Sequence, residues 1–106
     1  MGHLIDAFLN EQVEIKPYIR MSGGGTPVYG ETETRACRME MGAYLRGVYK
    51  AASGQIDQVE ARAKMFCTGN KIPSDSIVTY DGEDYKVIDC QIMRGFGYSH
   101  LEVVLA

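Results

Sequence analysis

Histidines and carboxylates are the side chains of this sequence that could do acid–base chemistry. His3 lies near the start of the chain, and His100 is followed two residues later by Glu102. Neither histidine stands beside a serine or cysteine motif for nucleophilic catalysis. A strand histidine next to a glutamate is more typical of a solvated surface pair than of a metal site. We therefore predict no catalytic residues, no metal ligands and no enzymatic activity.

The densest group of carboxylates is the tetrapeptide DGED at residues 81–84. Asp-Gly is the dipeptide preferred by tight type I′ hairpin turns, and acidic residues are common in such turns. A turn therefore accounts for these carboxylates without acid–base work. A small enzyme remains an alternative, which a deep pocket lined by His100, Glu102 and Asp84 would favour.

The sequence contains three cysteines, Cys37, Cys67 and Cys90, which are widely spaced and form no CxxC pair. An odd number at this spacing argues against a disulfide framework and against a zinc site. Free cysteines are among the residues most often buried, so we predict that they are core residues. Reduced thiols are typical of a protein made in the cytosol. We expect no cofactor.

Length and charge restrict the class of protein further. The 106 residues correspond to a single domain, 1–106, and the formal net charge is −3. A dedicated binder of duplex DNA is normally basic, because phosphate neutralisation supplies much of its affinity. No apolar run approaches the roughly 18 residues of a membrane helix, and the first residues lack the features of a signal peptide. We expect no membrane partner and synthesis in the cytoplasm.

Alternation of apolar and polar residues is the main secondary-structure signal. It is clearest over residues 57–67, where every second residue from Val59 to Cys67 is apolar and is expected to face inward. Over residues 32–41 the same rule predicts a strand with Cys37, Met39 and Met41 on its inner face.

Further strands are predicted on both sides of this central part. Residues 12–20 alternate, but Pro17 cannot donate a ladder hydrogen bond, so this strand is expected at an edge or to break. Residues 77–93 form a predicted hairpin around Asp81-Gly82, and the apolar pair Val87-Ile88 suggests a bulge in its second arm. The last eight residues alternate again.

Together these segments predict an all-β chain, a small β-barrel of about six antiparallel strands. Residues 1–11 are predicted to be an N-terminal arm or a short helix, because Leu4 and Phe8 are spaced by four. One long inter-strand loop is predicted at 43–56. Hairpins usually need only about two to five connecting residues, so a loop of this length is unusual.

The long loop combines aromatic, apolar and basic residues and has no acidic residue. On loop length alone it would be a flexible surface loop. Tyrosines alternating with basic residues could also form a stacking platform for single-stranded nucleic acid, as in a small OB-like binding module. The net acidity of the chain disfavours that alternative. The residues concerned are Tyr44, Leu45, Arg46, Val48, Tyr49 and Lys50.

The order of motifs along the chain resembles a known family. AKMFC is followed by TGNKIPSDSIVTYDGEDYKVIDCQ, a glycine-rich turn and HLEVVL, and the first half contains EIKPYI, VYGE and TRACRME. This order and spacing resemble the small head–tail connector proteins of tailed bacteriophages, also called stopper or head-completion proteins. The resemblance covers residues 12–105.

The resemblance implies a small β-barrel that forms a ring below the portal and its adaptor in the virion neck. Such a ring extends the DNA channel, helps to retain the packaged genome and docks the tail. The implied partners are copies of the chain itself, the upstream portal or adaptor protein, the downstream tail protein and, transiently, packaged DNA. In this family a long loop points into the channel, and 43–56 lies at the matching place. Arg46 and Lys50 would then repeat around the ring as a basic collar facing DNA.

Overall fold

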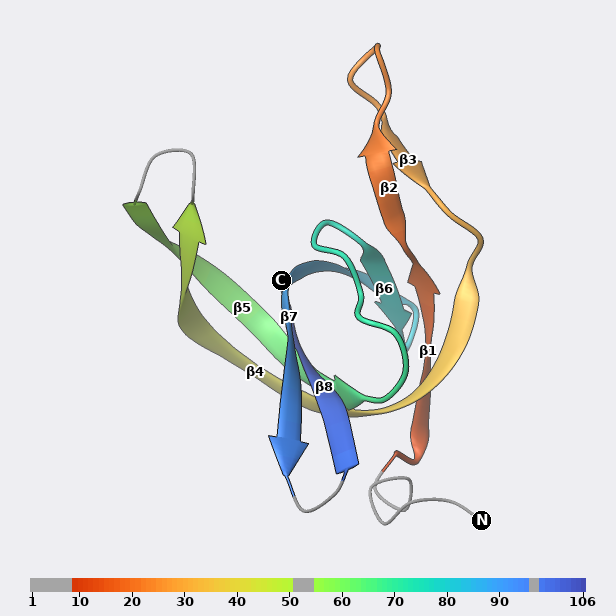
Figure 1. Cartoon of the computed structure of the whole chain (residues 1–106), viewed down its shortest axis with the longest axis vertical. Coiled ribbons are helices and arrows are strands. Elements are labelled where there is room, and N and C mark those ends of the chain that lie inside the picture. Colours follow the sequence, from red (N-terminus) through yellow and green to blue (C-terminus); the bar gives the residue numbers. More distant parts are fainter. Residues whose placement is uncertain (1–8, 51–54, 96–97) are drawn as a thin grey trace.

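The computed structural model describes the backbone of residues 9–50, 55–95 and 98–106, and the side chains of 9–42, 60–95 and 99–106 (Figure 1). Most of the predicted N-terminal arm or helix, 1–11, therefore lies outside the described residues. Glu11, at its end, already belongs to the first strand.

The described chain is all-β, as predicted. Six strands form a closed antiparallel barrel in the order β1-β4-β5-β8-β7-β6, and β2 and β3 form a separate two-stranded arm. The strands are β1 (Glu11–Lys16), β2 (Tyr18–Met21), β3 (Pro27–Tyr29), β4 (Glu33–Lys50), β5 (Gln55–Cys67), β6 (Ile77–Tyr80), β7 (Glu83–Gly95) and β8 (Tyr98–Leu105).

Pro17 separates the barrel from the β2–β3 arm. β1 ends at Lys16 and β2 begins at Tyr18, so of the two alternatives for Pro17 the structure has the break. β1 itself is not an edge strand, because it pairs with both β4 and β6. The backbone N–H of Tyr18 donates to the Ser76 hydroxyl at 2.9 Å. Ser76 is fully buried, so this hydrogen bond satisfies its side chain and fixes the base of the arm.

The barrel interior is filled by alternate residues of its strands. Ala61, Ala63, Met65 and Cys67 are all fully buried, which confirms the predicted alternation over the described part of 57–67. Their neighbours in the core are contributed by the other five strands. These include Ile15, Cys37, Val78, Val87, Val103 and Leu105.

Two local predictions for the hairpin of β6 and β7 are also confirmed. Asp81 and Gly82 have φ angles of 52° and 79°, the positive values that a type I′ turn requires at both central positions. The register of β7 against β8 shifts between Val87 and Asp89, as a bulge predicts.

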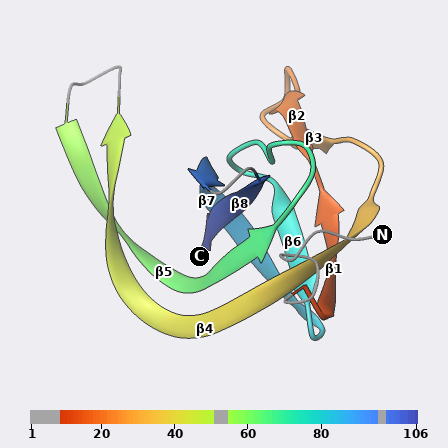
Figure 2. The same cartoon turned by 60° about the horizontal axis from the view of Figure 1, so that its bottom comes forward.

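The predicted loop at 43–56 is wrong for most of its length. β4 continues to Lys50 and β5 begins at Gln55, and the two strands remain paired from Tyr44↔Ala61 to Lys50↔Gln55. Strand pairing satisfies backbone groups that an open loop would leave to water. We call residues 44–50 and 55–61 the ribbon; residues 51–54 between its strands lie outside the described part. The ribbon stands away from the barrel in both views (Figures 1 and 2).

Candidate functional site

A bulge in β4 marks the root of the ribbon. Met41 lies opposite Ala63 and Tyr44 lies opposite Ala61, so Gly42 and the next residue of β4 face a single residue of β5. Gly42 has a φ of 155°. Bulges bend the strand that carries them and increase its twist. Figure 2 shows β4 and β5 curving together out of the barrel wall.

The point at which β4 leaves the barrel explains why one residue was placed wrongly. Met41 was predicted to face the core with Cys37 and Met39, but it is 55 % exposed. Cys37 is fully buried and Met39 is partly buried against the core. β4 leaves the barrel between Met39 and Met41, so the same face of the strand passes from core to solvent.

The ribbon is paired on one side only within the described chain. β1 pairs with β4 no further than Cys37, and β8 pairs with β5 only from Ala63 to Cys67. Beyond these points the only partner of each described strand is the other. At about 3.3 Å per residue, the seven residues 44–50 extend this two-stranded unit by roughly 20 Å.

All six residues predicted from the loop lie in β4. The structure thus brings them together on one strand of the ribbon, whereas their side chains lie outside the described residues. Their register partners on β5 are Ala61 for Tyr44, Glu60 for Leu45, Val59 for Arg46, Asp57 for Val48, Ile56 for Tyr49 and Gln55 for Lys50.

A carboxylate on β1 holds the β4 side of the ribbon's root. Glu11 accepts hydrogen bonds from the backbone N–H of Met39 at 2.8 Å and from the Tyr80 hydroxyl at 2.7 Å. The Met39 N–H is the largest cause of a lowered Glu11 pKa, followed by the Tyr80 hydroxyl. Sequence reasoning missed this group. Its only signal is a glutamate at the start of the first strand.

On the β5 side of the root, Arg62 is engaged by the barrel. Its guanidinium lies 4.4 Å from the centre of the Tyr85 ring, and Nη2 donates to the Asp84 backbone oxygen at 3.1 Å. The cation–π contact and the hydrogen bond join β5 to β7 where the ribbon begins.

Cys37 and Cys67 form no reactive site. Cys37 and Cys67 lie directly opposite each other on β4 and β5, all three cysteines are free, and all three are buried as predicted. Burial raises the pKa of the Cys37 thiol to about 12 and also raises that of Cys67, although the Arg35 guanidinium lies 3.8 Å from the Cys67 sulfur. Such thiols stay protonated at neutral pH and are poor nucleophiles.

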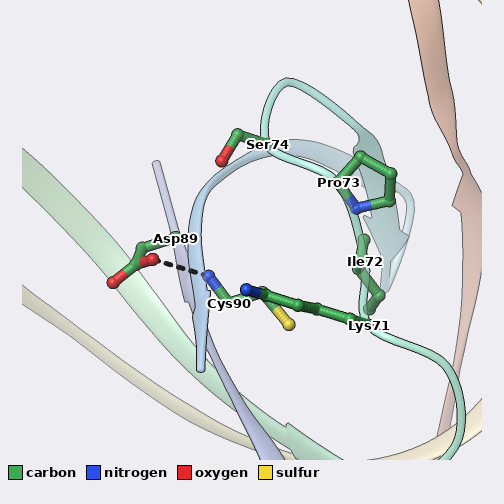
Figure 3. Close-up of a pocket in the computed structure, with 6 residues that line it drawn as sticks. All are labelled: Lys71, Ile72, Pro73, Ser74, Asp89 and Cys90. Atoms are coloured by element: carbon green, nitrogen blue, oxygen red, sulfur yellow. Dashed lines mark hydrogen bonds between the residues drawn. The ribbon is translucent and has the colours of Figure 1, made fainter. Parts of the chain in front are cut away.

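A cavity of about 300 Å³ lies beside β7 (Figure 3). Two of its polar side chains, Ser74 and Asp89, are engaged by hydrogen bonds of the fold. The Ser74 hydroxyl donates to the Ile88 backbone oxygen at 3.2 Å, and the Asp89 carboxylate accepts from the backbone N–H of Cys90 at 2.9 Å. The remaining lining residues are Lys71, Ile72 and Pro73, so no imidazole takes part in this cavity.

The residues that would favour an enzyme are not brought together. His100 packs at 6.1 Å from the Phe66 ring, and Glu102 forms an ion pair with Lys64 at 3.0 Å. Asp84 accepts from the Thr79 hydroxyl at 2.6 Å, within the β6–β7 hairpin. Among the described residues no group of three potential metal ligands occurs.

The comparisons with known proteins identify no relative. No protein-family model matches the chain, and no curated protein matches it. Within the described part of the chain, no helix is long and apolar enough to span a membrane.

Proposed function

We propose that this chain is a head–tail connector of a tailed bacteriophage, which forms a ring in the virion neck below the portal and its adaptor. The ring extends the DNA channel, helps to retain the packaged genome and docks the tail. The ribbon lines the channel, and Arg46 and Lys50 contact phosphates of passing DNA.

The observation that carries the proposal is a closed barrel from which one long ribbon projects. The order of sequence motifs from 12 to 105 resembles the connector family, in which an extension lies at this same place between two barrel strands. The barrel closes without the ribbon, so the ribbon is not required to cover an open edge of the barrel. This supports a role for the ribbon in contacts outside the barrel.

The charge distribution is compatible with a DNA channel. The whole chain carries a net charge of −3, whereas the β4 half of the ribbon contains Arg46 and Lys50 and no acidic residue. Acidic walls with one basic level would let DNA slide while making weak phosphate contacts at that level.

The proposal is tested by locating the chain in phage particles and by complementation. Antibody labelling of purified virions is expected to mark the neck. A phage with a conditional null mutation in this gene is expected to produce filled heads without tails. Complementation with a variant in which Asn-Gly replaces residues 45–60 is expected to give heads that fill and then lose DNA. Normal infectious particles from that variant would contradict a channel role for the ribbon.

A second variant separates the contribution of ribbon charge to DNA retention from that of ribbon length. Arg46→Glu with Lys50→Glu keeps the length and reverses the basic level. Lys16→Glu with Lys71→Glu, at two exposed positions outside the ribbon, is the control with the same net charge. DNA loss only in the ribbon variant assigns retention to phosphate contacts, and DNA loss only after shortening assigns it to a steric plug. Absence from the virion, together with an oligonucleotide complex that survives physiological salt, would instead favour the OB-like binding module.

A further inference from the structure

Each of the two ribbon strands has one backbone edge that pairs with no other described strand. On the β4 side, Glu11 accepts the Met39 N–H, and no described strand of the barrel pairs with β4 beyond it. On the β5 side, β8 pairs with β5 no further than Ala63. Ala106 exchanges two backbone hydrogen bonds with Lys86 of β7, each of 2.9 Å.

Open edges of this length are normally protected. Proteins shield them with proline, very short strands, charged side chains, bulges or a covering segment, because unpaired N–H and C=O groups form a template for another strand. In the ribbon the bulge lies only at the root, and the charges of the two strands are of opposite sign. Residues 43–62 contain no proline, and β4 and β5 are among the longest strands of the chain. The ribbon therefore offers two long edges on which a further strand can pair.

We propose that these edges pair with each other between copies, with the β4 edge of one copy beside the β5 edge of the next. β4 and β5 run in opposite directions, so the new pair is antiparallel, like every pair within the barrel. Each copy supplies one edge of each kind. The contact is therefore head-to-tail, and repeated by a closing rotation it joins the ribbons into one continuous sheet around an axis.

The charges of the two strands favour pairing of a β4 edge with a β5 edge over pairing of two like edges. Residues 44–50 of β4 carry only Arg46 and Lys50, and residues 55–61 of β5 carry only Asp57 and Glu60. Pairing of two β4 edges or of two β5 edges would bring like charges together, which destabilises a sheet. Pairing of β4 with β5 brings opposite charges onto adjacent strands.

In the internal register no charged residue of the ribbon lies directly opposite another charged residue. Arg46 lies opposite Val59 and Lys50 lies opposite Gln55. The acidic residues are likewise opposite uncharged ones, Asp57 opposite Val48 and Glu60 opposite Leu45. In the proposed pairing, a neighbouring strand adds oppositely charged residues along the outer edge of each strand.

The edge pairing is inferred from strand register and sequence, whereas its place around a DNA channel rests on the proposed function. The two can fail separately, because self-association of the pure chain is measured without phage particles. If the chain forms a ring with another role, the edge pairing holds and the proposed function fails. If it is a connector whose copies touch only through their barrels, the proposed function holds and the edge pairing fails.

Amide hydrogen exchange of the isolated full chain, measured by NMR from about 20 µM to 1 mM, tests the pairing. In an antiparallel strand alternate residues direct their N–H groups to opposite sides, so one edge receives every second amide. We expect added protection at high concentration on every second residue of 44–50 and of 55–61. Exchange that does not change with concentration, or protection gained only outside the ribbon, would overturn the inference.

A charge swap sharpens the test. Arg46→Glu with Lys50→Glu, and separately Asp57→Lys with Glu60→Lys, is each expected to raise the concentration for half-maximal protection about tenfold. The chain carrying all four changes is expected to recover the original concentration, because opposite charges face each other again. Lys16→Glu with Lys71→Glu serves as the control and is expected to leave the concentration unchanged. Failure of the fourfold variant to recover would exclude the proposed pairing of β4 with β5.

Discussion

The barrel and the ribbon are made from the same two strands, yet they have different sources of order. Within the barrel, β4 and β5 each have a partner on both sides, and their inward residues Cys37, Met65 and Cys67 are fully buried. Beyond Met41, among the described strands, β4 and β5 pair only with each other. We therefore expect the barrel to be stable in one copy, whereas the ribbon would gain a second set of partners through the proposed pairing with neighbouring copies.

This contrast separates folding from function in the chain. Closure of the sheet and the buried core stabilise the barrel. An isolated two-stranded hairpin is at best marginal in water. We therefore expect changes in the core to alter the free energy of unfolding and changes in the ribbon to alter assembly. The pure chain should be mostly monomeric at micromolar concentration, which sedimentation velocity measures.

The largest expected effect is at a fully buried residue of β8. Leu105→Ala should lower the free energy of unfolding by about 3 kcal/mol, because it removes buried methyl groups and leaves a cavity. Met41→Ala is the control on the exposed stretch of β4 and should cost less than about 0.5 kcal/mol. Urea unfolding followed by circular dichroism measures both. Equal losses would contradict the separation of barrel and ribbon.

A smaller effect is expected at the cross-strand cysteines. Cys37→Ser should lower the free energy of unfolding by about 1–3 kcal/mol, because a hydroxyl would replace a weakly polar thiol in a fully buried position. Cys37→Ala, which adds no polar group, should cost less. Native-state labelling by a thiol reagent should be slow at Cys37 and Cys67. Fast labelling of both would contradict their inward register.

The pH dependence of stability tests the root of the ribbon. Glu11 has a lowered pKa in the folded chain, so its carboxylate stabilises the fold above the unfolded pKa of about 4.3. This contribution is lost as the pH falls through the folded pKa. Glu11→Gln should therefore cost about 1 kcal/mol at pH 7 and less in acid, as for one hydrogen bond to a partly exposed charge. A cost that does not change with pH would assign no role to the Glu11 charge.

Much of the barrel could be predicted from the sequence, because its signals are local. Alternation identifies the buried face of β5, Pro17 marks the break between β1 and β2, and Asp81-Gly82 defines a turn with positive φ at both positions. Each of these features depends on neighbouring residues along the chain. The position at which β4 leaves the barrel depends instead on where β1 begins, which alternation does not reveal.

The candidate site was harder to predict for the same reason. Residues 43–56 lie between the two clearly alternating segments 32–41 and 57–67, and they were therefore predicted to be a loop. Pairing with β5 overrides that expectation, because strand propensity depends strongly on context. The contacts of Glu11 with Met39 and Tyr80 join three strands, β1, β4 and β6, and no sequence spacing encodes them.

The smallest effect on stability is expected from the largest change in sequence. Replacing residues 45–60 by Asn-Gly makes Tyr44 and Ala61 the closing pair of a two-residue hairpin, and it keeps the bulge, the buried Ala61 and the contact of Arg62 with Tyr85. Only the strand pairing beyond the barrel is removed.

We expect the free energy of unfolding of this shortened chain to change by less than about 1 kcal/mol, since shortening a connection alters its closure entropy only slightly. Urea unfolding measures the change, and the concentration-dependent amide protection of the intact ribbon should disappear in the same chain. The matched control replaces only residues 51–54 by Asn-Gly and should keep both properties, because the described strands of the ribbon remain. A barrel that unfolds when residues 45–60 are removed would show that the ribbon stabilises its own copy, and the division between a self-sufficient barrel and an assembly-dependent ribbon would then be wrong.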